Sequence, residues 1–108
     1  MNGELLVVYQ APFAQTCMGF RQDADYAIVW TEACQTRDCE EVWARFQRVE
    51  PGIAWPPDGY TGRSLSIGDV IGIGHEMFTP LGLGFRQLTP IERRLVLRAA
   101  SRMLEGGE

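Results

Sequence analysis

The chain has 108 residues, of which 45% are hydrophobic and 22% are charged, and these values are typical of one globular domain spanning residues 1–108. Its formal net charge is −4, and all of its basic residues are arginines. This acidic balance disfavours non-specific binding to nucleic acid or anionic membranes, because such binding requires clustered positive charge.

The sequence shows no targeting signal, and together with its cysteine content this predicts a cytoplasmic protein. The first residues lack the basic and apolar regions of a signal peptide, and no apolar run approaches the ~18 residues of a membrane helix. The three cysteines, Cys17, Cys34 and Cys39, show no zinc-ligand spacing, and their odd number favours reduced thiols, with a single disulfide as the alternative. We therefore expect no metal, no cofactor and no membrane association; a monomer and a homodimer both remain open.

The first half of the chain predicts two strands and one helix. Leu5–Tyr9 and Tyr26–Trp30 are short runs rich in β-branched and aromatic residues, which favour strands. Between them, Ala11–Asp25 is mixed in composition and is expected to be mostly loop. Asp38 occupies an N-cap position, and apolar residues then recur at three- and four-residue steps, which predicts a helix of about three turns over Cys39–Val49.

The second half predicts an antiparallel meander. Val70–Ile73, Met77–Thr79 and Phe85–Leu88 are expected to be strands, separated by turns at Gly74–Glu76 and Leu81–Gly84. The connections are too short for crossover helices, so neighbouring strands should be antiparallel.

The last predicted element is a helix over about residues 90–104. Thr89 and Glu92 form a capping box, with proline at the first helical position. Apolar residues are expected to form a stripe along one side of this helix: Ile91, Leu95, Val96, Ala99, Ala100, Met103 and Leu104. The opposite side carries four arginines: Arg93, Arg94, Arg98 and Arg102. The order strand-strand-helix-strand-strand-strand-helix predicts an α+β domain with about five mostly antiparallel strands and two helices that cover one face of the sheet.

Known catalytic motifs do not match this sequence. The stretch Gly62–Ser66 reads G-R-S-L-S and lacks the second glycine of a nucleophile elbow. His75 is the only histidine and falls in a predicted turn, and the absence of lysine excludes a P-loop. We expect no catalytic residues. An enzyme that uses a cleft remains as a third alternative, with four candidate residues: Asp58, Arg63, Ser64 and Asp69.

The glycine-rich stretch before the third strand predicts a capped turn. Ser66 and Asp69 have the spacing of reciprocal caps, in which the serine oxygen accepts from the Asp69 amide and the carboxylate accepts from the Ser66 amide. One tight helical turn should result, anchored in the core by Leu65 and Ile67. Glycines at positions 62 and 68 suit backbone angles that side chains disfavour, so Gly62, Ser66, Gly68 and Asp69 are interpreted as a structural signature.

Several motifs in series resemble the YodL-like domain. They are ADYAIVWTEAC, EEVWARF, PPDGYTGRSLSIGDVI and the pair Gly84–Phe85, which together cover about residues 25–88, with Tyr9–Gln10 similar to the family's first strand. Gly68 stands where the family pattern has serine, Thr79–Leu83 departs from it, and the final helix lies outside it. The resemblance implies an accessory module of phages, plasmids and integrative elements that helps incoming DNA against host defences, and it implies no catalytic residues.

These observations favour a non-enzymatic protein of a mobile element that binds another protein. Its partner-binding candidates lie in and beside the glycine-rich stretch: Trp55, Asp58, Tyr60, Arg63 and Ser64. The alternative is a nucleic-acid-binding module that uses Arg63 together with Arg93, Arg94, Arg98 and Arg102.

Overall fold

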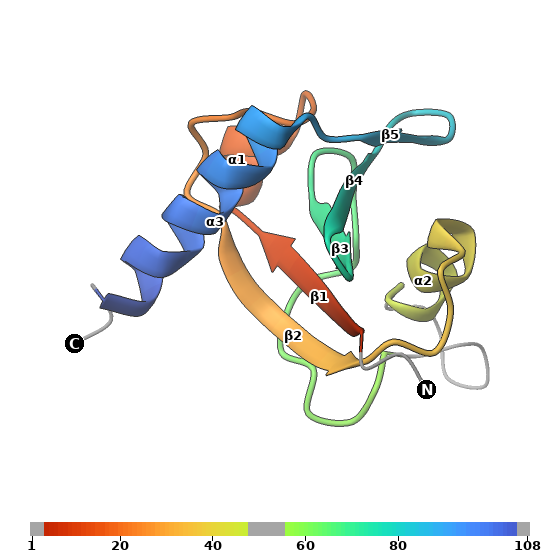
Figure 1. The fold of residues 1–108 in the computed structure, drawn as a ribbon. Coiled ribbons are helices and arrows are strands. Elements are labelled where there is room, and N and C mark those ends of the chain that lie inside the picture. Colours follow the sequence, from red (N-terminus) through yellow and green to blue (C-terminus); the bar gives the residue numbers. More distant parts are fainter. Residues whose placement is uncertain (1–3, 48–55, 106–108) are drawn as a thin grey trace.

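The computed structural model describes residues 4–47 and 56–105 and confirms the α+β class. Five strands form one antiparallel sheet in the spatial order β2-β1-β3-β4-β5 (Figure 1). The strands are β1 (Leu5–Gln10), β2 (Ala27–Ala33), β3 (Val70–Ile73), β4 (Glu76–Pro80) and β5 (Phe85–Gln87). The meander of β3, β4 and β5 is as predicted, and β1 lies in the interior of the sheet between β2 and β3.

Helices cover both faces of the sheet, so the prediction of one covered face is wrong. On β1, Leu6 and Val8 belong to a core cluster that also contains Phe46, which directly follows α2 (Cys39–Arg45). Tyr9 belongs to the other cluster, which contains Val96 of α3 (Pro90–Glu105). The continuous apolar run of β1 indicates two covered faces, because apolar and polar residues do not alternate in a strand that is buried on both sides.

A third helix lies in the segment expected to be loop. α1 (Phe13–Thr16) is a single turn that follows Pro12, and Thr16 is fully buried. The backbone of this segment lies against Gly68, since a Cβ atom placed on that glycine would meet the Thr16 carbonyl oxygen at 2.6 Å. One turn is too short to produce a helical period in the sequence, which explains why it was missed.

The helix α2 begins as predicted and ends early. The Asp38 side chain accepts a hydrogen bond from the Glu40 amide at 2.9 Å, which confirms the N-cap. Phe46 leaves the helix at φ −101° and ψ 22°, and its carbonyl accepts from the Leu65 amide at 3.2 Å. Contact with a distant segment therefore ends the helix at Arg45; the predicted residues 48–49 lie outside the described part of the chain.

The strand β2 extends three residues beyond its predicted end. Its residues Thr31–Ala33 pair with Leu5–Val7 of β1, and a register shift lies near Val8 and Tyr9. The extension includes a glutamate, which strand propensity disfavours. Glu32 is accommodated because it forms two hydrogen bonds with Arg45 of α2 at 2.5 and 2.6 Å.

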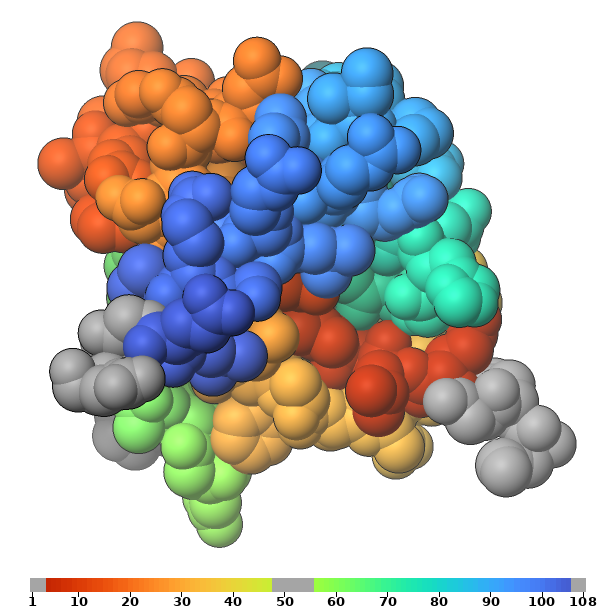
Figure 2. Space-filling model, turned by 60° about the vertical axis from the view of Figure 1, so that its left-hand side comes forward, coloured from red at the N-terminus to blue at the C-terminus, as the bar shows by residue number. Residues whose placement is uncertain are grey.

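The helix α3 has the predicted cap and a narrower buried face than predicted. The Thr89 amide donates to Glu92 at 2.9 Å and the Glu92 amide donates to the Thr89 hydroxyl at 3.2 Å, which confirms the capping box. Val96, Ala99 and Ala100 are buried, whereas three members of the predicted stripe are exposed, Ile91 by 63%, Met103 by 46% and Leu104 by 75%. Figure 2 shows α3 at the surface with β1 and β2 below it, and its last turns extend beyond the sheet in Figure 1. The sheet is thus too narrow to bury the whole stripe.

Candidate functional site

The polar contacts of the Gly59–Asp69 loop converge on Asp69. Its side chain is fully buried, and its oxygen Oδ2 accepts from the Arg63 guanidinium at 2.9 Å and the Gln10 side-chain amide at 3.1 Å. The Ser66 amide also donates to Oδ2, at 2.9 Å, so half of the predicted reciprocal cap is confirmed. Oδ1 has no hydrogen-bond partner within the described residues.

The second half of the predicted cap is wrong. The Asp69 amide donates to the backbone carbonyl of Ser66 at 3.1 Å, and the Ser66 hydroxyl instead accepts from Arg63 at 3.1 Å. Gly68 has φ +91°, a value that belongs to the third residue of a type II β-turn rather than to a helical turn. The turn therefore requires glycine at position 68.

Arg63 closes the loop against the body of the protein. Besides its bonds to Asp69 and Ser66, its guanidinium donates to the Ala11 carbonyl at 2.7 Å and lies 5.6 Å from the centre of the Phe13 ring. These contacts use both terminal nitrogens, and the side chain is 30% exposed. The guanidinium thus holds the loop in place, which is a structural role for one of the five predicted partner-binding residues.

The loop backbone is bound by side chains at the end of β1 and within the loop. Gln10 donates to the Arg63 carbonyl at 2.9 Å and accepts from the Arg63 amide at 3.2 Å, which imitates the pairing of a neighbouring strand. The buried Tyr60 hydroxyl donates to the same carbonyl at 2.7 Å. Gly62 does not have a positive φ, contrary to prediction; it is required because a Cβ atom there would lie 2.5 Å from the Tyr60 hydroxyl.

Burial dominates the ionisation of Asp69. Desolvation raises the pKa of this carboxyl above its ordinary value of 3.8, while the hydrogen bonds from Arg63 and the Ser66 amide act in the opposite direction. Because the folded state binds this proton more tightly than the unfolded state, Asp69 alone makes stability decrease as pH rises from about 3.8. The hydrogen bonds of the carboxylate connect the loop to Gln10 of β1 and to the turn at Ser66.

The predicted partner-binding residues that the structure describes differ in exposure. Asp58 is exposed, Ser64 is half-buried, Tyr60 is buried and Arg63 is bound within the loop. Trp55 lies outside the described residues. Of the structural signature, Ser66 and Asp69 lie in the turn, and Leu65 is buried as predicted, whereas Ile67 is only half-buried.

The residues of the catalytic alternatives differ in their surroundings. Asp69 is enclosed by the loop, and Asp58 faces solvent on it. Ser64 precedes β3 in the chain, and His75 lies in the turn between β3 and β4. Among the described residues, no three histidine, cysteine or carboxylate side chains are grouped as metal ligands.

The thiols are unpaired and one is strongly shielded. Cys17, Cys34 and Cys39 are free, and the Cys34 thiol donates to the Thr36 carbonyl at 3.1 Å. Burial raises the pKa of Cys39 to about 11, which keeps its thiol protonated and unreactive near neutral pH.

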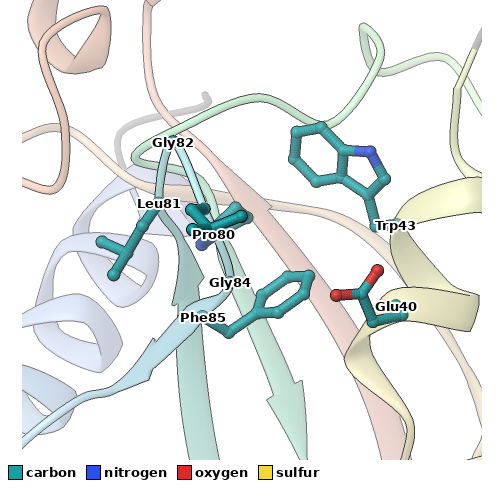
Figure 3. A pocket seen from close by; sticks show the side chains of 8 residues that line it. Glu40, Trp43, Pro80, Leu81, Gly82, Gly84 and Phe85 are labelled. Atoms are coloured by element: carbon teal, nitrogen blue, oxygen red, sulfur yellow. The ribbon is translucent and has the colours of Figure 1, made fainter.

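Two adjoining hollows form a groove beside the Gly59–Asp69 loop, the first lined by polar and apolar groups in similar measure and the second mostly apolar. The first, of about 240 Å³, lies between α2 and the turn that joins β4 to β5 (Figure 3). Its lining comprises Glu40, Trp43, Pro80, Leu81, Gly82, Leu83, Gly84 and Phe85. The second, of about 390 Å³, is lined by Phe13, Cys17, Trp43, Leu65, Ser66, Ile67, Leu81 and Gly82. Both share Trp43, Leu81 and Gly82, and we call the combined surface the α2–hairpin groove.

Exposed apolar side chains border this groove. Leu81 is 43% exposed, Leu83 93% and Phe13 56%, and each of them lines one or both hollows. Turn residues are usually polar, so leucines at these positions are not explained by the turn itself. A contiguous apolar surface with a hollow is a feature of interaction sites.

The sequence reasoning missed this groove. A usable signal was present in Leu81-Gly82-Leu83-Gly84, where two leucines occupy a predicted turn. A second signal is the i, i+3 spacing of Glu40 and Trp43, which places them on one side of α2. The groove itself joins segments that lie far apart in the chain, and only the fold brings them together.

The arginines of α3 form a separate basic ridge. Arg94, Arg98 and Arg102 are exposed at i, i+4 and i+8, which places them along one line of the helix. Among the described residues, none of the three forms an ion pair. Arg93 is half-buried and lies off this line. No helix in the described part of the chain has the length and apolar character needed to cross a membrane.

Comparison with protein families gives one match. A family model described as the YodL-like domain matches residues 7–80, from β1 to the end of β4, and includes the whole Gly59–Asp69 loop. The match ends before Gly84–Phe85 and before α3. No curated protein and no solved structure matches the chain.

Proposed function

The chain belongs to the YodL-like domain family, and we propose that it is a non-enzymatic accessory protein of a mobile genetic element that binds another protein through the α2–hairpin groove. The proposed setting is the cytoplasm of a host cell, where the protein counteracts a defence system. The single observation that carries the proposal is the groove, with two exposed leucines in a tight turn over an apolar hollow.

The groove has the composition of a small binding surface. Trp43 and Phe85 contact each other edge-to-face, with ring centres 6.4 Å apart, and this fixes the wall formed by α2 against the hairpin. Aromatic side chains in preformed hollows contribute a large share of binding energy at protein interfaces. Leu81 and Leu83 lie in a turn that the backbone bond from the Leu81 amide to the Gly84 carbonyl, at 2.9 Å, holds in shape.

The Gly59–Asp69 loop supports this surface without contributing its charged groups. Ser66 and Ile67 line the second hollow, and their position depends on the turn held by Asp69. The loop thus acts as architecture that positions one wall of the groove.

Site-specific photo-crosslinking tests the proposal. A photoreactive phenylalanine analogue is placed at position 83 in the groove, or at position 104 on α3 as the matched exposed control. In host cells, the position-83 variant should crosslink to one protein that the position-104 variant does not capture. The identified protein is then purified and its affinity for the unmodified chain is measured by calorimetry. Equal crosslinking from both positions, or no measurable affinity of the purified protein, contradicts the proposal.

The biological setting requires its own experiment. The mobile element is transferred into restricting and non-restricting hosts with the wild-type gene or with Leu81→Ser/Leu83→Ser. If the protein counteracts a defence system, the variant should lower transfer only into the restricting host. An equal reduction in both hosts would point to another role in the element.

The basic ridge of α3 supports a second candidate function, nucleic-acid binding. Arg94, Arg98 and Arg102 have the spacing of successive helix turns, and phosphate contacts depend on such cations. Arg63 is no longer part of this candidate, because its guanidinium is bound inside the loop. Fluorescence anisotropy with duplex and single-stranded DNA at about 150 mM salt tests it: binding that Arg94→Gln/Arg98→Gln/Arg102→Gln abolishes would support it, and no binding by the wild type would exclude it.

A further inference from the structure

The first hollow of the groove combines a carboxylate with two aromatic walls. Glu40 and Trp43 come from the same side of α2, and Phe85 comes from the start of β5. In Figure 3 the Glu40 carboxylate points toward the hollow that Trp43 and Phe85 border. The two rings are inclined at 77°, so they form two walls of a corner rather than one flat surface.

Glu40 and its neighbour Glu41 are not ion-paired within the described residues, and of the two only Glu40 lines the first hollow. Glu32, Glu76 and Glu92 each form an ion pair with an arginine of the chain. Glu40 is exposed and forms no ion pair within the described residues, and it lines the hollow together with Trp43 and Phe85. An anionic ligand would be repelled there, and a neutral apolar ligand would leave the carboxylate without a partner and partly desolvated.

A cationic side chain with an apolar stem can pair with the Glu40 carboxylate and contact the aromatic rings at the same time. An arginine side chain can lay its methylene stem along Leu81 and Leu83, stack its planar guanidinium on an aromatic ring and donate to a carboxylate. Lysine provides the charge but lacks the planar, forked donor set. The hollow, at about 240 Å³, has room for one long side chain.

We propose that the Glu40–Trp43–Phe85 hollow binds an arginine side chain of the partner protein. This inference rests on the proposed function and specifies the partner's chemistry: an arginine in the first hollow and an apolar side chain in the adjoining second one. Charge complementarity favours a foreign, basic segment over a second copy, because the chain itself carries a net charge of −4.

The test uses the whole chain and small probes in an NMR titration. N-acetyl-arginine amide is compared with N-acetyl-citrulline amide, which has nearly the same shape without the charge. The Trp43 indole signal, assigned with Trp43→Phe, should shift saturably with the arginine probe, together with the amides of residues 81–85. The citrulline probe should bind at least about fivefold more weakly, as expected for the loss of one exposed ion pair and one cation–π contact.

Two substitutions on α2 provide the matched pair. Glu40→Gln should weaken the preference for arginine over citrulline to the part supplied by the aromatic rings, whereas Glu41→Gln, an exposed neighbour that does not line the hollow, should retain the full preference. Equal shifts with both probes, or an unchanged preference in Glu40→Gln, overturn the inference. If the arginine inference fails in this way but crosslinking at position 83 still identifies a partner, the proposed function stands. The inference and the proposed function are therefore tested separately.

The source of the arginine is tested by oligomeric state. The chain should remain monomeric in light scattering across the concentration range of the titration. A concentration-dependent dimer that Arg98→Gln/Arg102→Gln abolishes would assign the arginine to a second copy and overturn the proposal of a foreign partner.

Discussion

Asp69 connects the chemistry of one side chain to the shape of the whole loop. It lies at the end of a β-turn and accepts hydrogen bonds from three different segments: β1 through Gln10, the loop through Arg63 and the turn through Ser66. Thr79 of β4 additionally donates to its carbonyl at 2.7 Å. Removal of this side chain should therefore release the loop from the sheet.

Asp69→Ala should lower the free energy of unfolding by about 3 kcal/mol, because it leaves the Arg63 guanidinium without its carboxylate in a partly buried site. Urea unfolding followed by circular dichroism measures this change. Asp58→Ala is the control from the same loop, and since Asp58 is exposed, its effect should stay within about 0.5 kcal/mol. Equal stability of the two variants would show that the network around Asp69 does not hold the loop.

Gly68→Ala should cost about 2 kcal/mol or more, because φ is +91° and a Cβ atom would lie 2.6 Å from the Thr16 carbonyl oxygen. Two other glycines separate these causes. Gly84→Ala tests the positive φ alone, since nothing lies within 4 Å of its Cβ position, and Gly82→Ala has neither problem. The melting temperature should be highest for Gly82→Ala, lower for Gly84→Ala and lowest for Gly68→Ala. If Gly68→Ala is no less stable than Gly84→Ala, the α1 backbone does not lie as close to Gly68 as the structure shows.

Part of this residue-level arrangement could be predicted from the sequence. The Ser66–Asp69 spacing predicted the bond from the serine amide to the carboxylate, because both partners lie within one turn. The pairing of Arg63 with Ala11 could not be predicted, because these residues are 52 positions apart and meet only after the sheet has formed. Local bonds follow from spacing, whereas long-range bonds follow from topology.

At the level of elements, the residues at which helices and strands end depend on tertiary contacts, which secondary-structure propensity does not include. Both terminal caps, at Asp38 and Thr89, are local and were predicted. The end of α2 depends on Phe46 and Leu65, and the length of β2 depends on its register with β1. The assignment of α2 and α3 to opposite faces also requires the sheet order, in which β1 is an interior strand.

The contact between α2 and β2 should depend on pH through Glu32. Arg45 and the Trp30 indole donate hydrogen bonds to this carboxylate and lower its pKa below 4.5. A lowered pKa in the folded state means that the stabilisation is complete above about pH 4.5 and is lost as pH falls through the folded-state value.

Glu32→Gln should therefore cost about 1 kcal/mol near neutral pH, where part of the pair is screened by solvent, and less as the solution is acidified below about pH 4.5. Unfolding curves at several pH values measure this difference. Glu41→Gln, on the exposed side of α2, should show no such dependence. A difference that grows on acidification would contradict the role assigned to Glu32.

At the level of the whole molecule, two candidate surfaces lie on different elements. The α2–hairpin groove combines a mostly apolar hollow with one that Glu40 lines, and the ridge of α3 is basic. Because α2 and α3 cover opposite faces of the sheet, substitutions on one surface should leave the other unchanged. The sequence alone could indicate the basic ridge, which lies on one helix, but the groove requires four separate segments to meet: the α1 region, α2, the Gly59–Asp69 loop and the turn between β4 and β5.

The affinity of the crosslinked partner for three forms of the chain tests the central claim most directly. Calorimetry compares the wild type with Leu81→Ser/Leu83→Ser in the groove and Leu97→Ser/Leu104→Ser on α3, two pairs of exposed leucines. The groove variant should bind at least about tenfold more weakly, as expected when anchors at the centre of an interface are removed, and the α3 variant should bind like the wild type. An unchanged affinity of the groove variant, or a loss confined to the α3 variant, would contradict the assignment of the binding surface to the groove.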